Sequence, residues 1–299
     1  MFDTSPQLDC AGRILKLDRT RVMGIVNVTP DSFSDAGAHF DVEAAVAHGL
    51  RLAAEGADVL DVGGESTRPG ANEVPLEEEL RRVVPVIERL ARETSLPVSV
   101  DTSKPEVMRA AVDAGAGLVN DVYALRREGA LDAVAELGVP VVLMHMLGEP
   151  RSMQDAPEYD DVVGDVHRFL AERIFVAEMA GIAKKRIVVD PGFGFGKTTQ
   201  HNLQLLAQLE RFTELGVPVL AGLSRKRTIG ELTGRDEPRE RLHGSVAAHL
   251  VAAQRGAGIV RVHDVAATVD ALKVWQAVAT VPLPRKAADA PPIRWPDEA

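Results

Sequence analysis

Short apolar runs alternate with amphipathic segments along most of the chain. The first run, at residues 22–26, contains branched side chains and stops at Asn27, which is typical of a strand buried on both faces. Similar runs predict further strands at residues 58–62, 97–101, 117–120, 140–145, 186–190, 218–222 and 258–262. The segments between and after them predict helices at residues 41–56, 76–93, 105–115, 130–137, 159–181, 203–215, 239–256 and 265–279. Asp41 is the expected N-cap of the first helix.

Regular alternation of strand and helix indicates a parallel sheet, because each helix returns the chain to begin another strand in the same direction. Eight such units favour closure into a (β/α)8 barrel, the TIM barrel, over an open doubly wound sheet. We therefore predict an α/β protein with a single barrel domain at residues 22–281. From Leu8 to Asp18, apolar and polar residues alternate loosely around Ala11 and Gly12, which predicts a short β-hairpin in the N-terminal segment, residues 1–21. The proline-rich tail, residues 282–299, is expected to be disordered.

Composition narrows the partners and the location. A net charge of -10 argues against a nucleic-acid partner, since binding a phosphate backbone requires a positive field. Cys10 is the only cysteine, which excludes an internal disulfide and fits a reducing compartment. The chain begins without a secretory signal pattern, and no apolar stretch approaches the roughly 18 residues of a membrane span. We expect a cytoplasmic protein that contacts neither nucleic acid nor membrane.

Polar side chains occupy nearly every predicted strand end. They are Asn27, Asp61, Asp101, Asn120, Asp121, His145, Asp190, Ser224, Arg261 and His263. Any single Asp or Asn among them could simply cap the following helix. Together they predict a functional face, because the loops after the strands of such a barrel share one end. Asp101, Asn120 and Asp190 follow buried strands, and their carboxylate and amide groups suit the N–H edge of a polar heterocycle.

Basic residues suggest a place for an anion. Arg261 and His263 flank the end of the last strand, where barrels often bind phosphate, so an anionic leaving group is plausible. Lys226 follows the pair Ser224-Arg225 and is a further basic group at a strand end. Arg225 and Arg227, on either side of it, are expected to be solvated surface residues.

The glycine-rich segment at residues 190–198 does not have the spacing of a Walker phosphate loop. Its glycines instead allow sharp bends that turn Phe193 and Phe195 towards a ligand or towards the core, and for Phe195 both interpretations stay open. Asn27, with Asp31 and Asp35, could hold a hard cation such as Mg²⁺ through oxygen, with water and substrate phosphate completing its shell.

Five motifs closely resemble those of the dihydropteroate synthases of the folate pathway. They are MGIVNVTPDSFSD at residues 23–35, GESTRPG at 64–70, DPGFGFGK at 190–197, SRK at 224–226 and RVHD at 261–264. The resemblance runs from about Val22 to Val278. It implies a barrel enzyme, a transferase that joins 6-hydroxymethyl-7,8-dihydropterin diphosphate to p-aminobenzoate and releases pyrophosphate with the help of Mg²⁺. It also implies a homodimer formed through the last helices.

The resemblance assigns roles position by position. It implies that Asp101, Asn120, Asp190 and Lys226 hold the pterin, and that Asn27, Arg261 and His263 handle metal and diphosphate. The residues implied for the p-aminobenzoate pocket are Thr67, Arg68, Pro69, Phe195 and Ser224, with Phe33 and Asp35 on a loop that closes over it. The chain departs from the family at Tyr123, where a small or polar residue is more usual.

Three alternatives remain beside this activity. A pterin-binding methyltransferase domain shares the barrel but would lack the Ser-Thr-Arg-Pro sequence at residues 66–69 and the SRK motif, which are both present here. A non-catalytic pterin-binding homologue would be expected to lose Asn27 or Arg261, and both are present. A phosphate-binding barrel isomerase is the most distant of the three.

Overall fold

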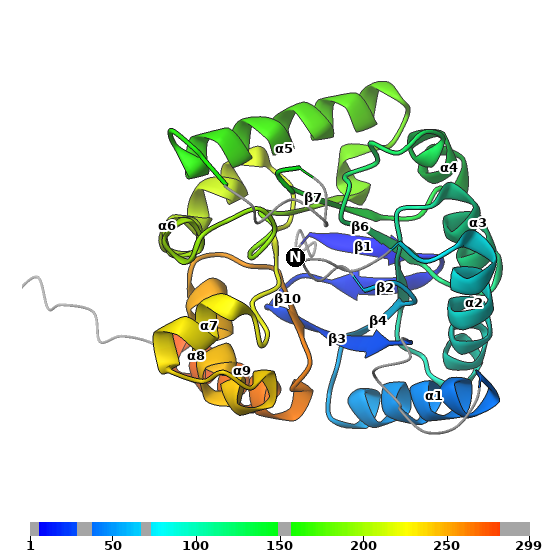
Figure 1. The fold of residues 1–299 in the computed structure, drawn as a ribbon, viewed down its shortest axis with the longest axis horizontal. Coiled ribbons are helices and arrows are strands. Elements are labelled where there is room, and N and C mark those ends of the chain that lie inside the picture. Colours follow the sequence, from blue (N-terminus) through cyan, green and yellow to red (C-terminus); the bar gives the residue numbers. More distant parts are fainter. Residues whose placement is uncertain (1–5, 29–37, 67–72, 149–156, 282–299) are drawn as a thin grey trace, which may run out of the picture.

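Eight parallel strands form the centre of the protein, with helices around them (Figure 1). The computed structural model describes residues 6–28, 38–66, 73–148 and 157–281. The strands are β3 (Arg21–Asn27), β4 (Val59–Gly63), β5 (Val98–Asp101), β6 (Leu118–Asp121), β7 (Val141–Met144), β8 (Ile187–Asp190), β9 (Leu220–Ala221) and β10 (Ile259–Val262). They neighbour one another in chain order, β10 pairs with β3, and a bridge between Val189 and Val219 closes the sheet. The predicted (β/α)8 barrel is confirmed.

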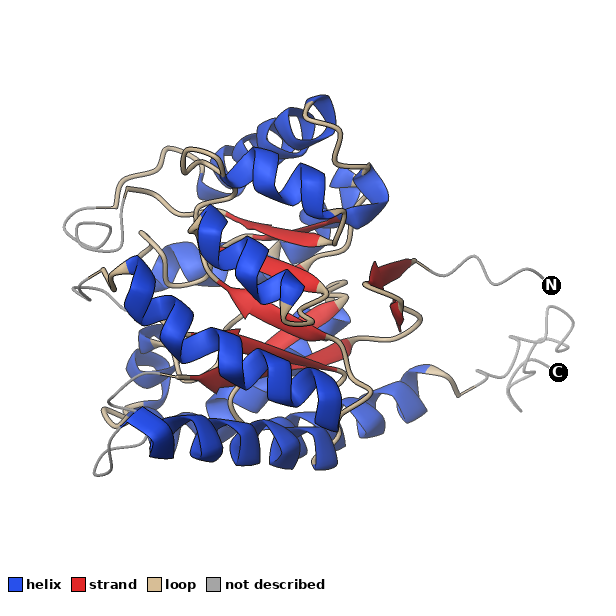
Figure 2. Ribbon diagram, turned by 90° about the vertical axis from the view of Figure 1, so that its right-hand side faces the viewer, coloured by secondary structure: helices blue, strands red, loops and turns tan. Residues whose placement is uncertain are grey.

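Helices cover the outside of this barrel, as Figure 2 shows from the side. The α-helices of the described residues are α1 (Ala38–Ala54), α2 (Leu76–Glu93), α3 (Pro105–Asp113), α4 (Ala130–Leu137), α5 (Val162–Met179), α6 (Thr199–Ala207), α7 (Arg227–Thr233), α8 (Leu242–Gln254) and α9 (Val265–Ala279). Short 3-10 segments are η2 (Lys184–Arg186), η3 (Leu209–Leu215) and η4 (Pro238–Arg241). None of the helices in the described ranges is both long and apolar enough to cross a membrane.

Most predicted elements are found, and their bounds differ in a few places. Strand β6 extends to Asp121, one residue beyond the prediction, while β9 is only Leu220–Ala221. The prediction that Asp41 caps the first helix is wrong, because α1 already begins at Ala38. Asp161 caps α5 by accepting a hydrogen bond from the Val163 N–H at 3.2 Å.

The region after β8 differs most from the prediction. Helix α6 begins at Thr199, earlier than expected, because Thr198 and His201 form a capping box. It ends at Ala207, and the rest of the predicted helix is the 3-10 segment η3. Helix α7 was not predicted at all; it has only seven residues, which is too short to show a helical repeat of apolar positions.

The interior of the barrel has two levels along its strands. One level is apolar and is formed by Met23, Val59, Leu118, Val142, Val188, Leu220 and Ile259. Two residues further along these same strands lie Ile25, Asp61, Asn120, Met144, Asp190, Gly222 and Arg261. Because side chains two apart on a strand face the same side, the second level also points inward. The interior thus changes from apolar to largely polar towards the carboxyl ends of the strands.

An antiparallel hairpin packs against the apolar level of the barrel. It consists of β1 (Gln7–Cys10) and β2 (Arg13–Lys16), as predicted, and lies at one end of the barrel (Figure 2). Its buried side chains Leu8, Cys10 and Leu15 join the same apolar cluster. The backbone comes close to Gly117, where an added Cβ would lie 2.4 Å from the Cys10 carbonyl oxygen. The hairpin therefore closes the amino-terminal end and leaves the polar end for function.

Candidate active site

A cavity opens at the polar end of the barrel. It encloses about 460 Å³ of space, part of it continuous with open solvent. Its wall is formed by residues at the strand ends and in the loops that follow: Ile25, Asp101, Asn120, Val122, Met144, Asp190, Phe195, Gly222, Ser224, Lys226, Arg261 and His263. The structure thus brings together eight site residues predicted from the sequence: Asp101, Asn120, Asp190, Phe195, Ser224, Lys226, Arg261 and His263.

Arg261 lies between two carboxylates in this wall. Its Nε donates to Asp61 Oδ2 at 2.6 Å, and its Nη2 donates to Asp101 Oδ2 at 2.6 Å. Asp61 Oδ2 also accepts a hydrogen bond from Asn120 Nδ2 at 3.1 Å. This network joins four strands and fixes the plane of the guanidinium group at the cavity wall.

Burial and neighbouring charge shift the pKa values in this network. Burial raises the pKa of Asp101 to about 7, against the opposing effect of Arg261. Burial lowers the pKa of Arg261, but the carboxylates of Asp61 and Asp101 outweigh it, so the net shift is upward. Arg261 therefore stays cationic, whereas Asp101 can exchange a proton near neutral pH.

Asp190 and Lys226 form the opposite-charge pair of the cavity. Asp190 Oδ1 accepts a hydrogen bond from the Gly192 N–H at 2.7 Å. Lys226 Nζ donates to the Phe193 carbonyl oxygen and lies 4.3 Å from the centre of the Phe195 ring. Burial raises the pKa of Asp190, while Lys226 opposes this; burial lowers the pKa of Lys226 to about 8, while Asp190 opposes it. Each group keeps the other closer to its charged form.

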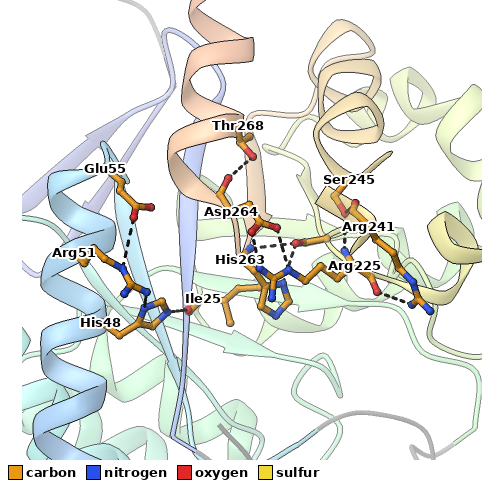
Figure 3. A network of polar contacts seen from close by, with 11 residues as sticks. Ile25, His48, Arg51, Glu55, Arg225, Arg241, Ser245, His263, Asp264 and Thr268 are labelled. Atoms are coloured by element: carbon orange, nitrogen blue, oxygen red, sulfur yellow. Dashed lines mark hydrogen bonds and ion pairs between the residues drawn. The ribbon is translucent and has the colours of Figure 1, made fainter. Parts of the chain in front are cut away.

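Two loops meet beside the cavity, after β9 and after β10. Ser224 Oγ lies 2.9 Å from His263 Nδ1 and accepts the His263 backbone N–H at 3.1 Å. Arg225 makes a two-pronged ion pair with Asp264, with Nε 3.0 Å from Oδ2 and Nη2 2.5 Å from Oδ1 (Figure 3). The expectation of a solvated Arg225 is therefore wrong, while Arg227 is indeed exposed, with 85% of its side-chain surface accessible.

A second set of contacts supports the cavity wall at β3. His48 Nε2 lies 3.2 Å from the Ile25 carbonyl oxygen, and His48 Nδ1 lies 2.7 Å from Arg51 Nη2 (Figure 3). Since a carbonyl and an arginine leave one donating and one accepting role, these partners fix the Nε2–H tautomer of His48. Burial lowers the pKa of His48, and Arg51 adds to the effect, so the ring stays neutral.

The glycine-rich segment after β8 separates its two phenylalanines. Phe193 is buried in the core with 1% of its surface exposed, and Phe195 lines the cavity. Phe195 also packs against a buried cluster of Val122, Met144 and Met146, so it combines packing with a place in the wall. Tyr123, the residue that departs from the family pattern, lies outside this wall and packs its ring 4.7 Å from the Arg127 guanidinium.

Several predicted residues cannot be placed. Phe33, Asp35, Thr67, Arg68 and Pro69 lie outside the described residues, as does Asp31. Asn27 is described at the end of β3, two residues after Ile25, so its side chain faces the same side as that cavity residue.

The donor set fits a loosely held Mg²⁺. Within the described ranges, no three His, Cys, Asp or Glu side chains gather as a metal site. One amide oxygen from Asn27 is nevertheless a hard ligand of the type that Mg²⁺ accepts when water and phosphate supply the rest. Among the described residues, Asn27 therefore suits a metal whose remaining ligands are water and phosphate.

Sequence reasoning did not assign three groups near the cavity to the site. Asp61 was noted only as a strand end, yet it is fully buried and holds both Arg261 and Asn120. Lys197 is 3% exposed, and its Nζ contacts carbonyl oxygens of the glycine-rich loop. Alternation along β4 could have revealed Asp61, since it lies two residues after the interior Val59; the contacts of Lys197 depend on the loop fold and leave no such signal.

The third group is centred on Glu79, a buried carboxylate. It accepts from Thr102 Oγ1 at 2.6 Å and from Lys104 Nζ at 2.5 Å, and Lys104 also reaches Glu65. These contacts hold the start of the loop after β4, where the sequence placed the Thr67 motif. Nothing in the local sequence pairs Glu79 with Lys104, since the contact spans 25 positions.

Known proteins similar to this chain are pterin-binding enzymes. A family model described as pterin binding enzyme matches residues 23–263. The chain is 52% identical over 271 residues to the dihydropteroate synthase of Escherichia coli (strain K12), covering 91% of this chain and 96% of the relative. It is 50% identical to that of Haemophilus influenzae, covering 89% of this chain and 97% of the relative.

Solved structures agree with these relatives. The Xanthomonas albilineans dihydropteroate synthase with 4-aminobenzoic acid superposes with a TM-score of 0.90 at 76% identity, covering 93% of this chain and 100% of that one. A structure of the same enzyme in complex with 7,8-dihydropteroate gives a TM-score of 0.86 at 72% identity over the same shares.

Proposed function

The chain belongs to the dihydropteroate synthase family of pterin-binding enzymes, and we propose that the cavity at its barrel mouth is the catalytic site. The protein is a transferase of folate biosynthesis that condenses 6-hydroxymethyl-7,8-dihydropterin diphosphate with p-aminobenzoate to give 7,8-dihydropteroate and pyrophosphate. The observation that carries the proposed site is the cavity in which carboxylates, an amide and Arg261 at the strand ends meet Lys226 and His263 from the following loops.

The pterin is held by Asp101, Asn120, Asp190 and Lys226. A pterin presents an amino group beside a ring N–H, which matches a carboxylate that accepts parallel hydrogen bonds. Asp190 suits this role because it is buried at the end of β8 with one oxygen already fixed by Gly192. Lys226 can donate to the pterin carbonyl from the same wall.

The diphosphate lies against Arg261 and His263, with Asn27 beside them. Arg261 offers a planar fork whose orientation Asp61 and Asp101 fix. Asn27 would hold Mg²⁺ together with water and the diphosphate oxygens, and the metal would supply further neutralisation of the leaving group.

p-Aminobenzoate packs against Phe195 and Ser224 on the side of the cavity nearest the loops. The family assigns Thr67, Arg68 and Pro69 to the same pocket, with Phe33 and Asp35 on a loop that closes over it. Phe195 supplies an apolar face for the benzoate ring. Lys226 Nζ lies 4.3 Å from the centre of the Phe195 ring and adds positive charge nearby.

The reaction proceeds by dissociative displacement. The C–O bond to the diphosphate breaks with its electron pair leaving on pyrophosphate, and the pterin ring stabilises the methylene cation that remains. Arg261 and His263 offset the negative charge that develops on the leaving group, and Asp101 and Asp190 offset positive charge on the pterin. The neutral arylamine then forms the C–N bond and releases a proton to solvent, so no strong base is required. Catalysis rests on positioning and charge.

A coupled assay tests this function. Pyrophosphate release from the pterin diphosphate is measured with and without p-aminobenzoate, and 7,8-dihydropteroate is measured in the same samples. We expect p-aminobenzoate to accelerate release strongly and, when it is present, release to match product formation one for one; a slow release without it is compatible with dissociative displacement. A non-catalytic pterin-binding homologue would release none, and a pterin-dependent methyltransferase would form no dihydropteroate.

Assembly and location complete the proposal. Large apolar side chains are exposed on the last helices or directly after them, at Leu232, Val251, Val274, Val278 and Val281. Such a group supports a homodimer formed through α7–α9. The single, buried Cys10 supports a reducing cytoplasm as the location.

A further inference from the structure

Lys197 is a buried lysine that the proposed chemistry does not use. Only 3% of its surface is exposed, and it is not part of the cavity wall. Its Nζ lies 2.9 Å from each of three acceptors, which are the Gly192 carbonyl, the Phe195 carbonyl and His145 Nδ1. Burial lowers the pKa of Lys197 well below its usual value, and the charge of Asp190 opposes this shift. The three contacts give the buried Nζ a hydrogen-bond partner on each side and offset part of the cost of burial.

His145 is suited to complete this set. Burial lowers the pKa of His145, and the charge of Lys197 adds to the shift, so the ring stays neutral and Nδ1 can accept. The Phe169 ring packs edge-on at 4.8 Å and fixes the plane of the imidazole.

The loop at residues 191–196 is shaped around the Nζ atom of Lys197. Gly192 has a φ of +69°, and an added Cβ would lie 1.9 Å from the His145 carbonyl oxygen, so the loop backbone presses directly on β7's end. The Phe195 N–H donates to the Gly192 carbonyl at 3.1 Å, which closes a turn whose two inward carbonyls both face Lys197. With its carbonyl held inward, Phe195 directs its side chain to the cavity wall.

We propose that Lys197, with His145, is a positioning residue that sets the place of Phe195 in the p-aminobenzoate pocket. The contact is indirect, because Lys197 touches the backbone of the loop and not the cavity. The inference rests on the proposed function, in which Phe195 packs against the benzoate ring. The position of Asp190 depends on Lys197 less, because its backbone belongs to β8 and pairs with β7. Lys197 acts on Asp190 only as a lesser influence on its pKa, after burial, Lys226 and the Gly192 N–H.

A double-mutant cycle tests this. Lys197→Met keeps the length of the side chain and removes the donors, and we expect KM for p-aminobenzoate to rise about tenfold while KM for the pterin diphosphate changes less than about threefold. In a Phe195→Ala background, which itself raises KM for p-aminobenzoate, Lys197→Met should add little. A general loss of folding would instead add fully to the Phe195→Ala effect and would affect both substrates.

Tyr159→Phe is the matched control. Tyr159 donates its hydroxyl to the Gly196 carbonyl at 2.9 Å, so the variant loosens the same loop from outside the Lys197 contacts. We expect a lower melting temperature with an unchanged KM for p-aminobenzoate. If Lys197→Met does not fold, His145→Leu, which removes one of the three acceptors, should give a smaller KM change of the same selectivity.

The failures can be told apart. If Phe195→Ala leaves KM for p-aminobenzoate unchanged, the proposed pocket and the role of Lys197 are both wrong. If Phe195→Ala raises it but the Lys197 and His145 variants do not, or act additively with it, the pocket stands and the positioning role is overturned.

Discussion

Arg261 lies between the carboxylates of Asp61 and Asp101, and this arrangement predicts how it responds to substitution. Lysine offers one ammonium group and cannot reproduce both the Nε contact to Asp61 and the Nη2 contact to Asp101. We expect Arg261→Lys to lower turnover at least about tenfold and to weaken pyrophosphate binding. Arg227→Lys, at an exposed site with the same chemical change, should leave both unchanged. Native turnover in Arg261→Lys would remove this residue from the diphosphate site.

Charge states of Asp101 and Lys226 predict a narrow pH optimum. The pKa of Asp101 is raised to about 7, so its carboxylate forms as pH rises through that value. The pKa of Lys226 is lowered to about 8, so its ammonium is lost as pH rises further. If the pterin needs both charges, kcat/KM for the pterin diphosphate should rise to about 7 and fall beyond about 8. Lys226→Arg should move the falling limb to higher pH, and a flat profile between these limits in the native enzyme would contradict the assignment.

Residue-level prediction succeeded where one strand carries the whole signal. Asp101 and Asp190 end apolar strands, Asn120 and Arg261 are the last residues but one of theirs, and the fold brings all four into one cavity. It failed for Arg225, whose partner Asp264 is 39 positions away, since an ion pair across two loops has no local pattern. The ion pair between Asp61 and Arg261 joins residues 200 positions apart and could not be predicted for the same reason.

At the scale of elements, the hairpin β1–β2 closes one end of the barrel while the loops at the other end carry the chemistry. Leu8 is 1% exposed within the apolar level of the barrel, and Leu8→Ala should therefore cost about 2–5 kcal/mol of stability through the cavity it leaves. Ile14, in the same hairpin, is 48% exposed, and Ile14→Ala should cost little.

Denaturant unfolding compares these two variants, and KM values show whether the site is affected. We expect both variants to keep native KM values, because the hairpin and the cavity lie at opposite ends of the strands. A changed KM in Leu8→Ala at full folding would mean that the two ends are coupled.

Element prediction depended on length and neighbours. The strands could be predicted because burial on both faces makes them continuously apolar. The α6–η3 break could not, because a change from α-helical to 3-10 hydrogen bonding leaves the spacing of apolar side chains nearly intact. Helix α7 has only seven residues, and its position is set by the turn at Ser224–Lys226 before it, where Arg225 has a φ of +56°.

For the whole molecule, the apolar surface of α7–α9 predicts a homodimer. We expect Val274→Glu with Val278→Glu to give monomers in sedimentation analysis, because both side chains are about two-thirds exposed, at 67% and 68%, and would place charge in the interface. Phe175→Glu, at a 64% exposed apolar site on α5, is the control and should leave assembly unchanged. A monomeric native protein would contradict the dimer, and a dimer lost only in Phe175→Glu would move the interface to α5.

The central claim is that the polar level of the barrel interior holds the pterin, and calorimetric titration of the pterin diphosphate into Asp190→Asn tests it most directly. Asparagine keeps the shape and can still accept from Gly192, so the fold should persist while charge-assisted hydrogen bonds worth about 1.5–3 kcal/mol each are lost. We predict an affinity at least about tenfold weaker than native, with Asp270→Asn, at an exposed aspartate, unchanged. Native affinity in folded Asp190→Asn would place the pterin elsewhere.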